Sequence, residues 1–173
     1  MNTTNSNSDT TATGTTVKEA EIIVHDDVPM VTIIREFDAT PDKVFQAHAD
    51  PDLYMSWVGP EGLAASQIDR WDFRTGGEWR YFSTHEGQEH GFHGCFHEVR
   101  PNEVIVQTFT YEGYPDSVAL ERLTLEDLGD GRTRLVATSL VDSFEGRDGF
   151  VASGMEVGVQ EGYRKLDALL PTL

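Results

Sequence analysis

The side chains best suited to chemistry gather in the stretch HEGQEHGFHGCFHEV, which contains four of the six histidines and the single cysteine. If residues 89–99 form one strand, successive side chains alternate between two faces. His93, Cys95 and His97 then share one face. A two-residue spacing permits a shared metal, but no third carboxylate nearby completes a ligand set, so we expect no metal site. Cys95 is expected to be a small packed residue.

The other face of that strand carries one acid among apolar and aromatic neighbours: His90, Phe92, Phe96 and Glu98. The two phenylalanines predict that this face points inward. Glu98 would then be a carboxylate in an apolar cavity, with a raised pKa, able to act as acid, base or ligand anchor. Alternatively, Glu98 pairs with an arginine such as Arg80 or Arg100. His90 is placed either at the cavity mouth or in a solvated turn.

Three glycines at four-residue spacing interrupt the otherwise helical segment SGMEVGVQEGYRKLDALL: Gly154, Gly158 and Gly162. Each costs about 1 kcal/mol relative to alanine in a helix interior. At about 100° per residue they form a bare strip along one margin of the apolar face. Either another element packs closely against this strip, or the strip leaves room for a ligand between helix and sheet. The sequence leaves both explanations open.

The helices and strands that position these residues can be predicted from the pattern of apolar residues and from turn and helix-start signals. Ile22–Val24 and Val31–Phe37 are typical of strands, with a break at Pro29. Thr40-Pro41 and Asp50-Pro51 are start signals for two short helices. Residues from 63 to about 140 predict some six antiparallel strands, and a long helix follows up to Pro171. This order predicts an α+β domain whose final helix lies on a curved sheet.

Length and composition set the domain organisation. Residues 1–18 are rich in Thr, Asn and Ser and predict a disordered tail, while residues 19–173 are long enough for a single domain. No apolar run approaches the roughly eighteen residues of a membrane span. The N-terminus lacks the features of a secretory signal, and a single cysteine fits a reducing compartment, so we expect a cytoplasmic protein.

Charge narrows the classes of partner. The chain has 30 acidic and 13 basic residues and a formal net charge of −17. Such a surface repels phosphate backbones and anionic lipids, which argues against nucleic acid and membrane surfaces as partners. The acids are spread along the chain, which favours solubility or a high-salt habitat. A homodimer is left open.

Motifs of common enzymes and cofactor sites are missing from the sequence, which has no nucleophile elbow, phosphate-binding glycine loop, HExxH or cysteine cluster. We therefore expect no cofactor. The aromatic side chains are the best candidates for a cavity wall, since strand alternation puts most of them on one sheet face. Core packing without a ligand is the alternative explanation.

Five stretches carry a resemblance to a known family: REFDATPDKVFQAHADPDLYMSWVGPEG, WDFRTGGEWRYF, HGCFHEVRPNEVIVQTFTYEG, LTLEDLGDGRTRLVATS and GMEVGVQEGYRKLDALL. In this order they resemble the START-like (SRPBCC) superfamily with the helix-grip fold. The resemblance is to the branch named after the activator of the heat-shock-protein-90 ATPase and covers residues 30–170. It is specific for the fold and much less so for the activity.

The resemblance implies an antiparallel sheet of about seven strands curled around the C-terminal helix, with two short helices after the first strand. The gap between sheet and helix would be an apolar ligand cavity. Two positions depart from the pattern, because Val58 and Val159 stand where aromatic residues are common. The expected ligand contacts are Trp57, Trp79, Tyr81, Phe92, Phe96, Glu98, Phe109, Tyr111, Met155, Gly158 and Val159.

Three functions are compatible with this resemblance. The first is binding of a small apolar or aromatic molecule in the cavity. The second is an enzyme of the cyclase, dehydratase or hydrolase kind, for which Glu98 and His90 are the titratable candidates. The third is a chaperone partner whose ATPase the protein stimulates. The third is least favoured, because a second, N-terminal domain accompanies the similar domain in the eukaryotic activator and only a short tail precedes the fold here.

Overall fold

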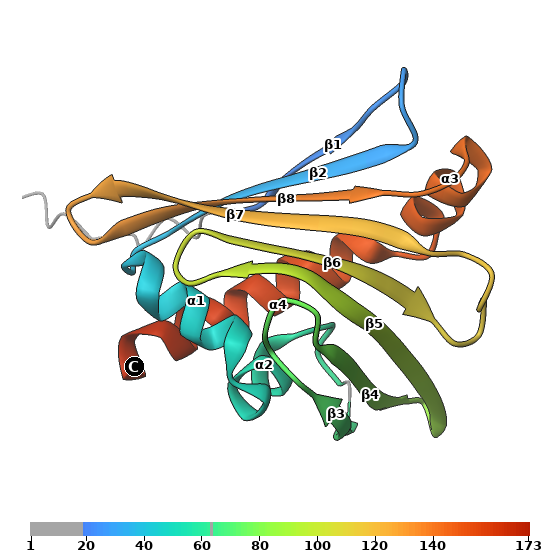
Figure 1. Cartoon of the computed structure of the whole chain (residues 1–173), viewed down its shortest axis with the longest axis horizontal. Coiled ribbons are helices and arrows are strands. Elements are labelled where there is room, and N and C mark those ends of the chain that lie inside the picture. Colours follow the sequence, from blue (N-terminus) through green and yellow to red (C-terminus); the bar gives the residue numbers. More distant parts are fainter. Residues whose placement is uncertain (1–18, 63) are drawn as a thin grey trace, which may run out of the picture.

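A curved antiparallel sheet forms most of the molecule (Figure 1). The computed structural model describes residues 19–62 and 64–173, so the tail predicted for residues 1–18 lies outside the described residues. The strand order is β1-β2-β8-β7-β6-β5-β4-β3. The strands are β1 (Glu21–Val24), β2 (Met30–Phe37), β3 (Ala64–Trp71), β4 (Glu78–His85), β5 (Gln88–Arg100), β6 (Val104–Tyr111), β7 (Ala119–Gly129) and β8 (Arg132–Leu140).

The predicted break at Pro29 separates two strands that form a hairpin, β1–β2, and this raises the strand number from about seven to eight. The two short helices therefore follow the second strand. β2 pairs along its whole length with β8, from Met30 opposite Leu140 to Phe37 opposite Thr133. The remaining strands, β3 to β8, form the predicted meander, so the N-terminal hairpin is added beside its last strand.

Helices α1 (Pro41–Ala49) and α2 (Pro51–Trp57) begin at the two predicted signals. Each has proline in its first turn, and the Asp50 carboxylate accepts hydrogen bonds from the amides of Asp52 and Leu53, both at 3.0 Å. Two indoles hold the end of α1, because Trp57 Nε1 donates to the Ala47 carbonyl at 2.9 Å and Trp71 Nε1 donates to the Ala49 carbonyl at 2.8 Å. These bonds satisfy carbonyls that a helix end leaves unpaired.

The terminal segment is two helices, α3 (Phe144–Ala152) and α4 (Met155–Leu169), where the sequence predicted one. The break falls at Gly154, which has φ 84° and ψ 24° and so adopts the left-handed conformation that favours glycine. Gly154 therefore lies at the start of α4 and not within a helix. Val151, predicted on the apolar face of the same helix, belongs to α3 and is exposed.

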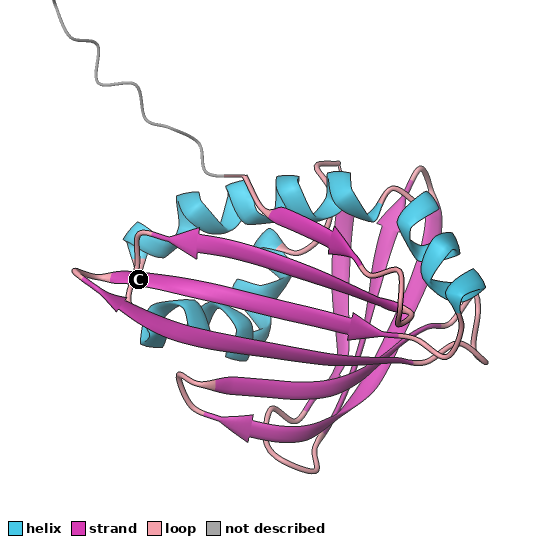
Figure 2. Ribbon diagram, turned by 90° about the horizontal axis from the view of Figure 1, so that it is seen from above, coloured by secondary structure: helices cyan, strands magenta, loops and turns pink. Residues whose placement is uncertain are grey.

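α4 lies across one face of the sheet, with α1 and α2 near its C-terminal end and α3 beyond its N-terminal end (Figures 1 and 2). The buried Arg35 of β2 forms an ion pair with Asp167 of α4. Nearer the N-terminus of α4, Gln160 Oε1 accepts a hydrogen bond from the Ala20 amide, and Gln160 Nε2 donates one to the Ala20 carbonyl, each at 2.9 Å. α4 is thereby fixed to the N-terminal strands. In the described residues, no helix is long and apolar enough to cross a membrane.

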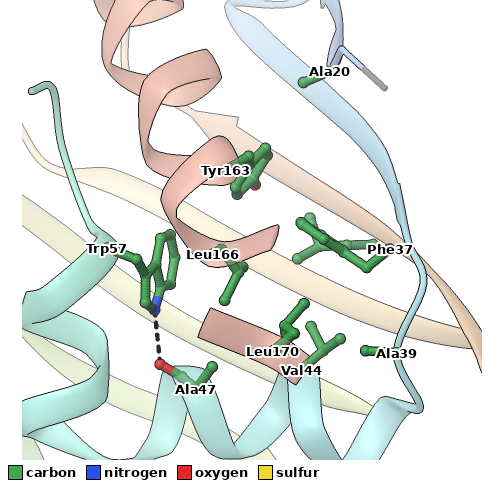
Figure 3. Close-up of a cluster of buried hydrophobic side chains, with 10 residues drawn as sticks. Ala20, Phe37, Ala39, Val44, Ala47, Trp57, Tyr163, Leu166 and Leu170 are labelled. Carbon is green, nitrogen blue, oxygen red and sulfur yellow. Dashed lines mark hydrogen bonds between the residues drawn. The ribbon is translucent and has the colours of Figure 1, made fainter. Parts of the chain in front are cut away.

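One group of buried side chains, here called the packed core, fills the space around the C-terminal half of α4 (Figure 3). Phe37 and Leu166 are fully buried, and the rings of Phe37 and Tyr163 meet edge to face at 5.4 Å. The members are Ala20, Phe37, Ala39, Val44, Ala47, Trp57, Leu135, Tyr163, Leu166 and Leu170. The packed core joins α1, α2, α4 and the sheet.

Candidate functional site

A cavity of about 400 Å³ lies between the sheet and helices α2 and α4. A volume of this order suits a small organic molecule. Its surface is mostly apolar, and its walls come from every strand from β2 to β8 and from all four helices. Nine of the eleven predicted contact residues line it: Trp57, Trp79, Tyr81, Phe92, Phe96, Phe109, Met155, Gly158 and Val159.

Strand alternation explains why the aromatic rings share this face. Trp79 and Tyr81 are two residues apart on β4, and Tyr81 lies opposite Phe92 of β5. The rings of Trp79 and Tyr81 stack with centroids 5.7 Å apart, and those of Tyr81 and Phe92 stack at 5.2 Å. Phe109 of β6 contacts both Trp79 and Phe92 at 5.6 Å. The cavity wall is therefore a continuous aromatic surface across three strands.

Glu98 does not line the cavity, so its predicted inward orientation is wrong. The reason is a bulge between β5 and β6: Phe96 is opposite Gln107, whereas Glu98 is opposite Val106, so β5 contains one extra residue at this point. A bulge reverses the alternation beyond it. Val99 consequently packs against the buried cluster of Trp79, Tyr81, Phe96 and Ile105. The Glu98 carboxylate lies 3.8 Å from the Arg100 guanidinium, as the alternative interpretation proposed.

Tyr111 also lies outside the cavity lining, although it touches residues that belong to it. Its ring is 5.3 Å from that of Phe92, and its hydroxyl is 2.7 Å from His90 Nδ1. His90 itself does line the cavity. Tyr111 lies opposite Phe92 on the same face of the sheet, beside the cavity wall, and its hydroxyl fixes the orientation of the His90 ring.

The carboxylate that does line the cavity is Glu121, which was not among the predicted contact residues. It lies opposite Gln107 of β6 and Ser139 of β8. Gln107 Nε2 donates to Glu121 Oε2 at 2.9 Å, and Ser139 also bonds the carboxylate through its side chain. Burial raises the pKa of Glu121, and these two hydrogen bonds oppose that rise. These three side chains are called the Glu121 row below.

A signal for Glu121 was present in the sequence. In ALERLTLED, Leu123 and Leu125 are two residues apart, and strand alternation places Glu121 on the same face. In the structure Leu123 lines the cavity and Leu125 packs against the packed core. An acid in phase with buried leucines marks an inward-facing carboxylate more directly than the histidine-rich stretch does.

Three tyrosines of the cavity are electrostatically coupled to Glu121: Tyr54 of α2, Tyr81 of β4 and Tyr163 of α4. Burial raises the pKa of each above that of a free phenol, and the Glu121 charge adds to the rise. Tyr54 and Tyr81 are also hydrogen-bonded to each other through their hydroxyls. All three side chains are therefore neutral phenols at ordinary pH.

His48 completes the titratable groups around the cavity. It is 7% exposed, and its ring meets that of Trp57 at 4.8 Å. Burial lowers the pKa of His48 to about 4, while its bond to the Val44 carbonyl, 2.7 Å from Nδ1, acts in the opposite direction. A neutral imidazole therefore donates from Nδ1 to Val44 at neutral pH.

The glycines of α4 face the segment that follows α2 and not the sheet. A Cβ at Gly162 would lie 3.1 Å from the Trp57 carbonyl oxygen, which is tighter than ordinary contact. A Cβ at Gly158 would lie 3.6 Å from Pro60 Cδ, an ordinary van der Waals distance. Close packing therefore explains Gly162. Gly158 borders the cavity and has room for a methyl group.

The outer face of β5 carries exposed groups. His93, Cys95 and His97 are all exposed, as the strand alternation predicted, but Cys95 is not packed as expected. His93 Nδ1 lies 3.2 Å from Glu112, whose carboxylate binds the Arg80 guanidinium at 2.7 and 3.0 Å. Among the described residues, no group of three or more His, Cys, Asp or Glu side chains could hold a metal ion.

This combination of a curved antiparallel sheet, two short helices and a long terminal helix over a cavity is the helix-grip fold. The family model described as activator of Hsp90 ATPase homolog 1-like protein matches residues 38–171. The chain therefore belongs to this family, which is of the START-like (SRPBCC) type, as the resemblance implied. No protein of curated function matches the chain.

Solved structures of bacterial proteins show the same fold. A Rhodobacter sphaeroides protein is 26% identical, with a TM-score of 0.77 over 90% of this chain and 99% of that one. A Chromobacterium violaceum protein is also 26% identical, with a TM-score of 0.70 over 81% and 96% of the two chains. An Arthrobacter aurescens protein of 24% identity reaches a TM-score of 0.79 over 88% and 92%, a likeness of fold alone.

Proposed function

We propose that the protein binds a small hydrophobic or aromatic molecule in the cavity between the sheet and α4. The observation that carries this proposal is an apolar space of about 400 Å³ whose wall is a continuous aromatic surface. Protein interiors are normally close-packed, so unfilled space on this scale is a feature that a purely structural domain would lack. Pockets of this kind, mostly apolar with a few polar groups, are typical of small-molecule sites.

The alternative of an enzyme based on Glu98 loses its geometric basis, because that carboxylate lies outside the cavity and beside Arg100. The carboxylate that lines the cavity is Glu121. The proposal therefore concerns binding, and the aromatic wall determines which molecules fit. Flat or ring-containing ligands gain the most from offset and edge-to-face contacts with these rings.

The test uses N-phenylnaphthylamine, a neutral fluorophore whose emission rises in apolar surroundings, followed by its displacement with lipids, aromatic polyketides and flavonoids. Val159 lines the cavity, whereas Val157 of the same helix is 56% exposed. We expect Val159→Trp to fill the cavity and abolish the fluorescence rise, while Val157→Trp leaves it unchanged. Thermal unfolding of both variants checks that they are folded.

The proposal is wrong if the wild type shows no rise and no displacing ligand. It is equally wrong if the two tryptophan variants bind the probe alike, since the probe then occupies another surface. Should Val159→Trp fail to fold, Ala137→Phe fills the same cavity from β8 and takes its place.

A further inference from the structure

The Glu121 row is a polar strip across the middle of an otherwise aromatic and aliphatic cavity. Its three members come from adjacent strands at positions that lie directly opposite one another. Gln107 donates a hydrogen bond to the carboxylate, and the bond with Ser139 likewise favours its charged form. Glu121 is therefore held as an acceptor, and its remaining accessible surface faces the cavity.

No cation balances this carboxylate within the part of the chain that the structure describes. Neither lysine nor arginine forms an ion pair with Glu121 there. The buried arginine of the fold, Arg35, is held by Asp167 and the Glu36 carbonyl. Arg122, which follows Glu121 in the sequence, also contributes to the cavity lining, but it is exposed. Buried charges in proteins are normally paired, so an unpaired carboxylate that faces a cavity indicates that its partner is the occupant.

The surroundings of Glu121 suit a cation. The phenol groups of three tyrosines interact electrostatically with Glu121, and the aromatic wall of Trp79, Phe92 and Phe109 lines the same cavity. Ring faces attract ammonium groups, and the attraction grows when water is excluded. The net charge of −17 adds a field that concentrates cations and repels anions.

We propose that the ligand of this cavity is an apolar or aromatic amine, whose ammonium group binds the Glu121 carboxylate beside the tyrosine rings while its apolar body lies against Trp79, Phe92 and Phe109. This inference rests on the proposed function and specifies the chemistry of its ligand. Burial raises the pKa of Glu121 in the empty cavity, and a bound cation would favour the charged carboxylate and offset that rise.

The experiment compares three probes with one aromatic body and different head groups: naphthylethylamine, naphthylethanol and naphthylacetic acid. Calorimetric titration at neutral pH measures the affinity of each for the wild type. We expect the amine to bind roughly tenfold or more tightly than the alcohol, since hydrogen bonds to charged groups exceed neutral ones by about that factor. The acid should bind most weakly.

Two variants test whether the tighter binding of the amine depends on Glu121. Glu121→Gln keeps the shape of the side chain and removes its charge, so the amine should lose its tenfold advantage while the alcohol keeps its affinity within about threefold. Glu126→Gln is the matched control, because Glu126 lies on the same strand but is exposed and paired with Arg134. It should leave all three affinities unchanged.

The outcomes separate the two proposals. If the alcohol binds the wild type as tightly as the amine, or if Glu121→Gln keeps the preference for the amine, this inference is overturned and the apolar cavity remains. If none of the three probes binds, the proposed function fails for ligands of this size and the inference fails with it. The wild-type comparison decides the matter even where Glu121→Gln does not fold.

Discussion

The two halves of α4 border different kinds of interior. Around its C-terminal half, Tyr163, Leu166 and Leu170 belong to the packed core, and Leu166 has no exposed surface. Around its N-terminal half, Met155 and Val159 face a cavity of about 400 Å³. Phe92 of the cavity wall is half-buried, whereas Trp79, Tyr81 and Phe96 of the same wall are buried in a second hydrophobic cluster. The packed core thus borders mainly the C-terminal half of α4 and the cavity mainly its N-terminal half, and Tyr163 belongs to both.

This division has a physical reason. Unfilled space removes dispersion contacts from the atoms that line it, so a fold that keeps a cavity needs dense packing elsewhere. The packed core supplies that density where α1, β2, β8 and α4 meet. The cavity end can then keep polar and titratable groups, such as His48 and Glu121, that a dense apolar core would exclude.

The largest expected effect tests the division directly with one substitution at each end. Phe37→Ala removes a fully buried ring and should lower the free energy of unfolding by about 3–5 kcal/mol. Phe92→Ala enlarges an existing cavity and removes a ring that is only half-buried, so its cost should stay below about 2 kcal/mol. Urea unfolding followed by circular dichroism measures both. Equal losses would show that the cavity end is as densely packed as the core.

The next effect is a pH dependence that belongs to the cavity end. His48 has a pKa of about 4 in the fold against 6.5 in an unfolded chain. Between these two pH values His48 is protonated in the unfolded chain but not in the folded protein. The free energy of unfolding therefore falls as pH drops from about 6.5 to about 4. The full shift corresponds to about 3 kcal/mol.

Replacement of this histidine measures how much of the loss of stability at acidic pH it causes. His48→Phe keeps an aromatic ring against Trp57 and removes the titration. We expect the stability of the variant to change less between pH 6.5 and 4 than that of the wild type, as measured by urea unfolding at several pH values. Parallel curves for the two proteins would show that the acid sensitivity arises elsewhere.

A smaller effect separates two glycines of α4 that the sequence could not distinguish. Gly158→Ala places a methyl group at ordinary contact distance from Pro60 and should stabilise the protein by up to about 1 kcal/mol through helix propensity. Gly162→Ala forces a methyl group against the Trp57 carbonyl and should destabilise it by about 1 kcal/mol or more. Thermal unfolding compares the two. Equal shifts would contradict the close approach inferred at Gly162.

These cases show what the sequence could and could not predict. Strand alternation placed Trp79, Tyr81, Phe92 and Phe96 correctly, because each lies on a regular stretch of β4 or β5. It failed for Glu98, because one extra residue in β5 reverses the alternation and no residue type at that point marks a bulge. Bulges depend on how two strands pair, which a single strand pattern does not contain.

The helical pattern failed in a similar way. Gly154 fits the four-residue spacing of the other two glycines, yet it adopts a left-handed conformation that ends one helix and precedes the next. Spacing alone does not distinguish a glycine that permits close packing from one that permits an unusual backbone angle. The partner of Gly162, the carbonyl of Trp57, lies 105 residues earlier in the chain and is known only from the fold.

The smallest effect concerns Glu121, whose pKa is raised in the fold. Its effect on stability as pH rises is therefore opposite to that of His48. The folded protein holds a proton on Glu121 at pH values where the unfolded chain has lost it, so this group makes the protein less stable as pH rises above 4.5. Glu121→Gln removes that charge while its amide can still bond Gln107 and Ser139. We expect the variant to be slightly more stable than the wild type at pH 7 and to lose that advantage below pH 4.5, as measured by urea unfolding.

A variant less stable at both pH values would mean that the carboxylate is needed by the fold itself. A stability gain at neutral pH that coincides with the loss of amine binding would instead show that the charge is retained for a ligand.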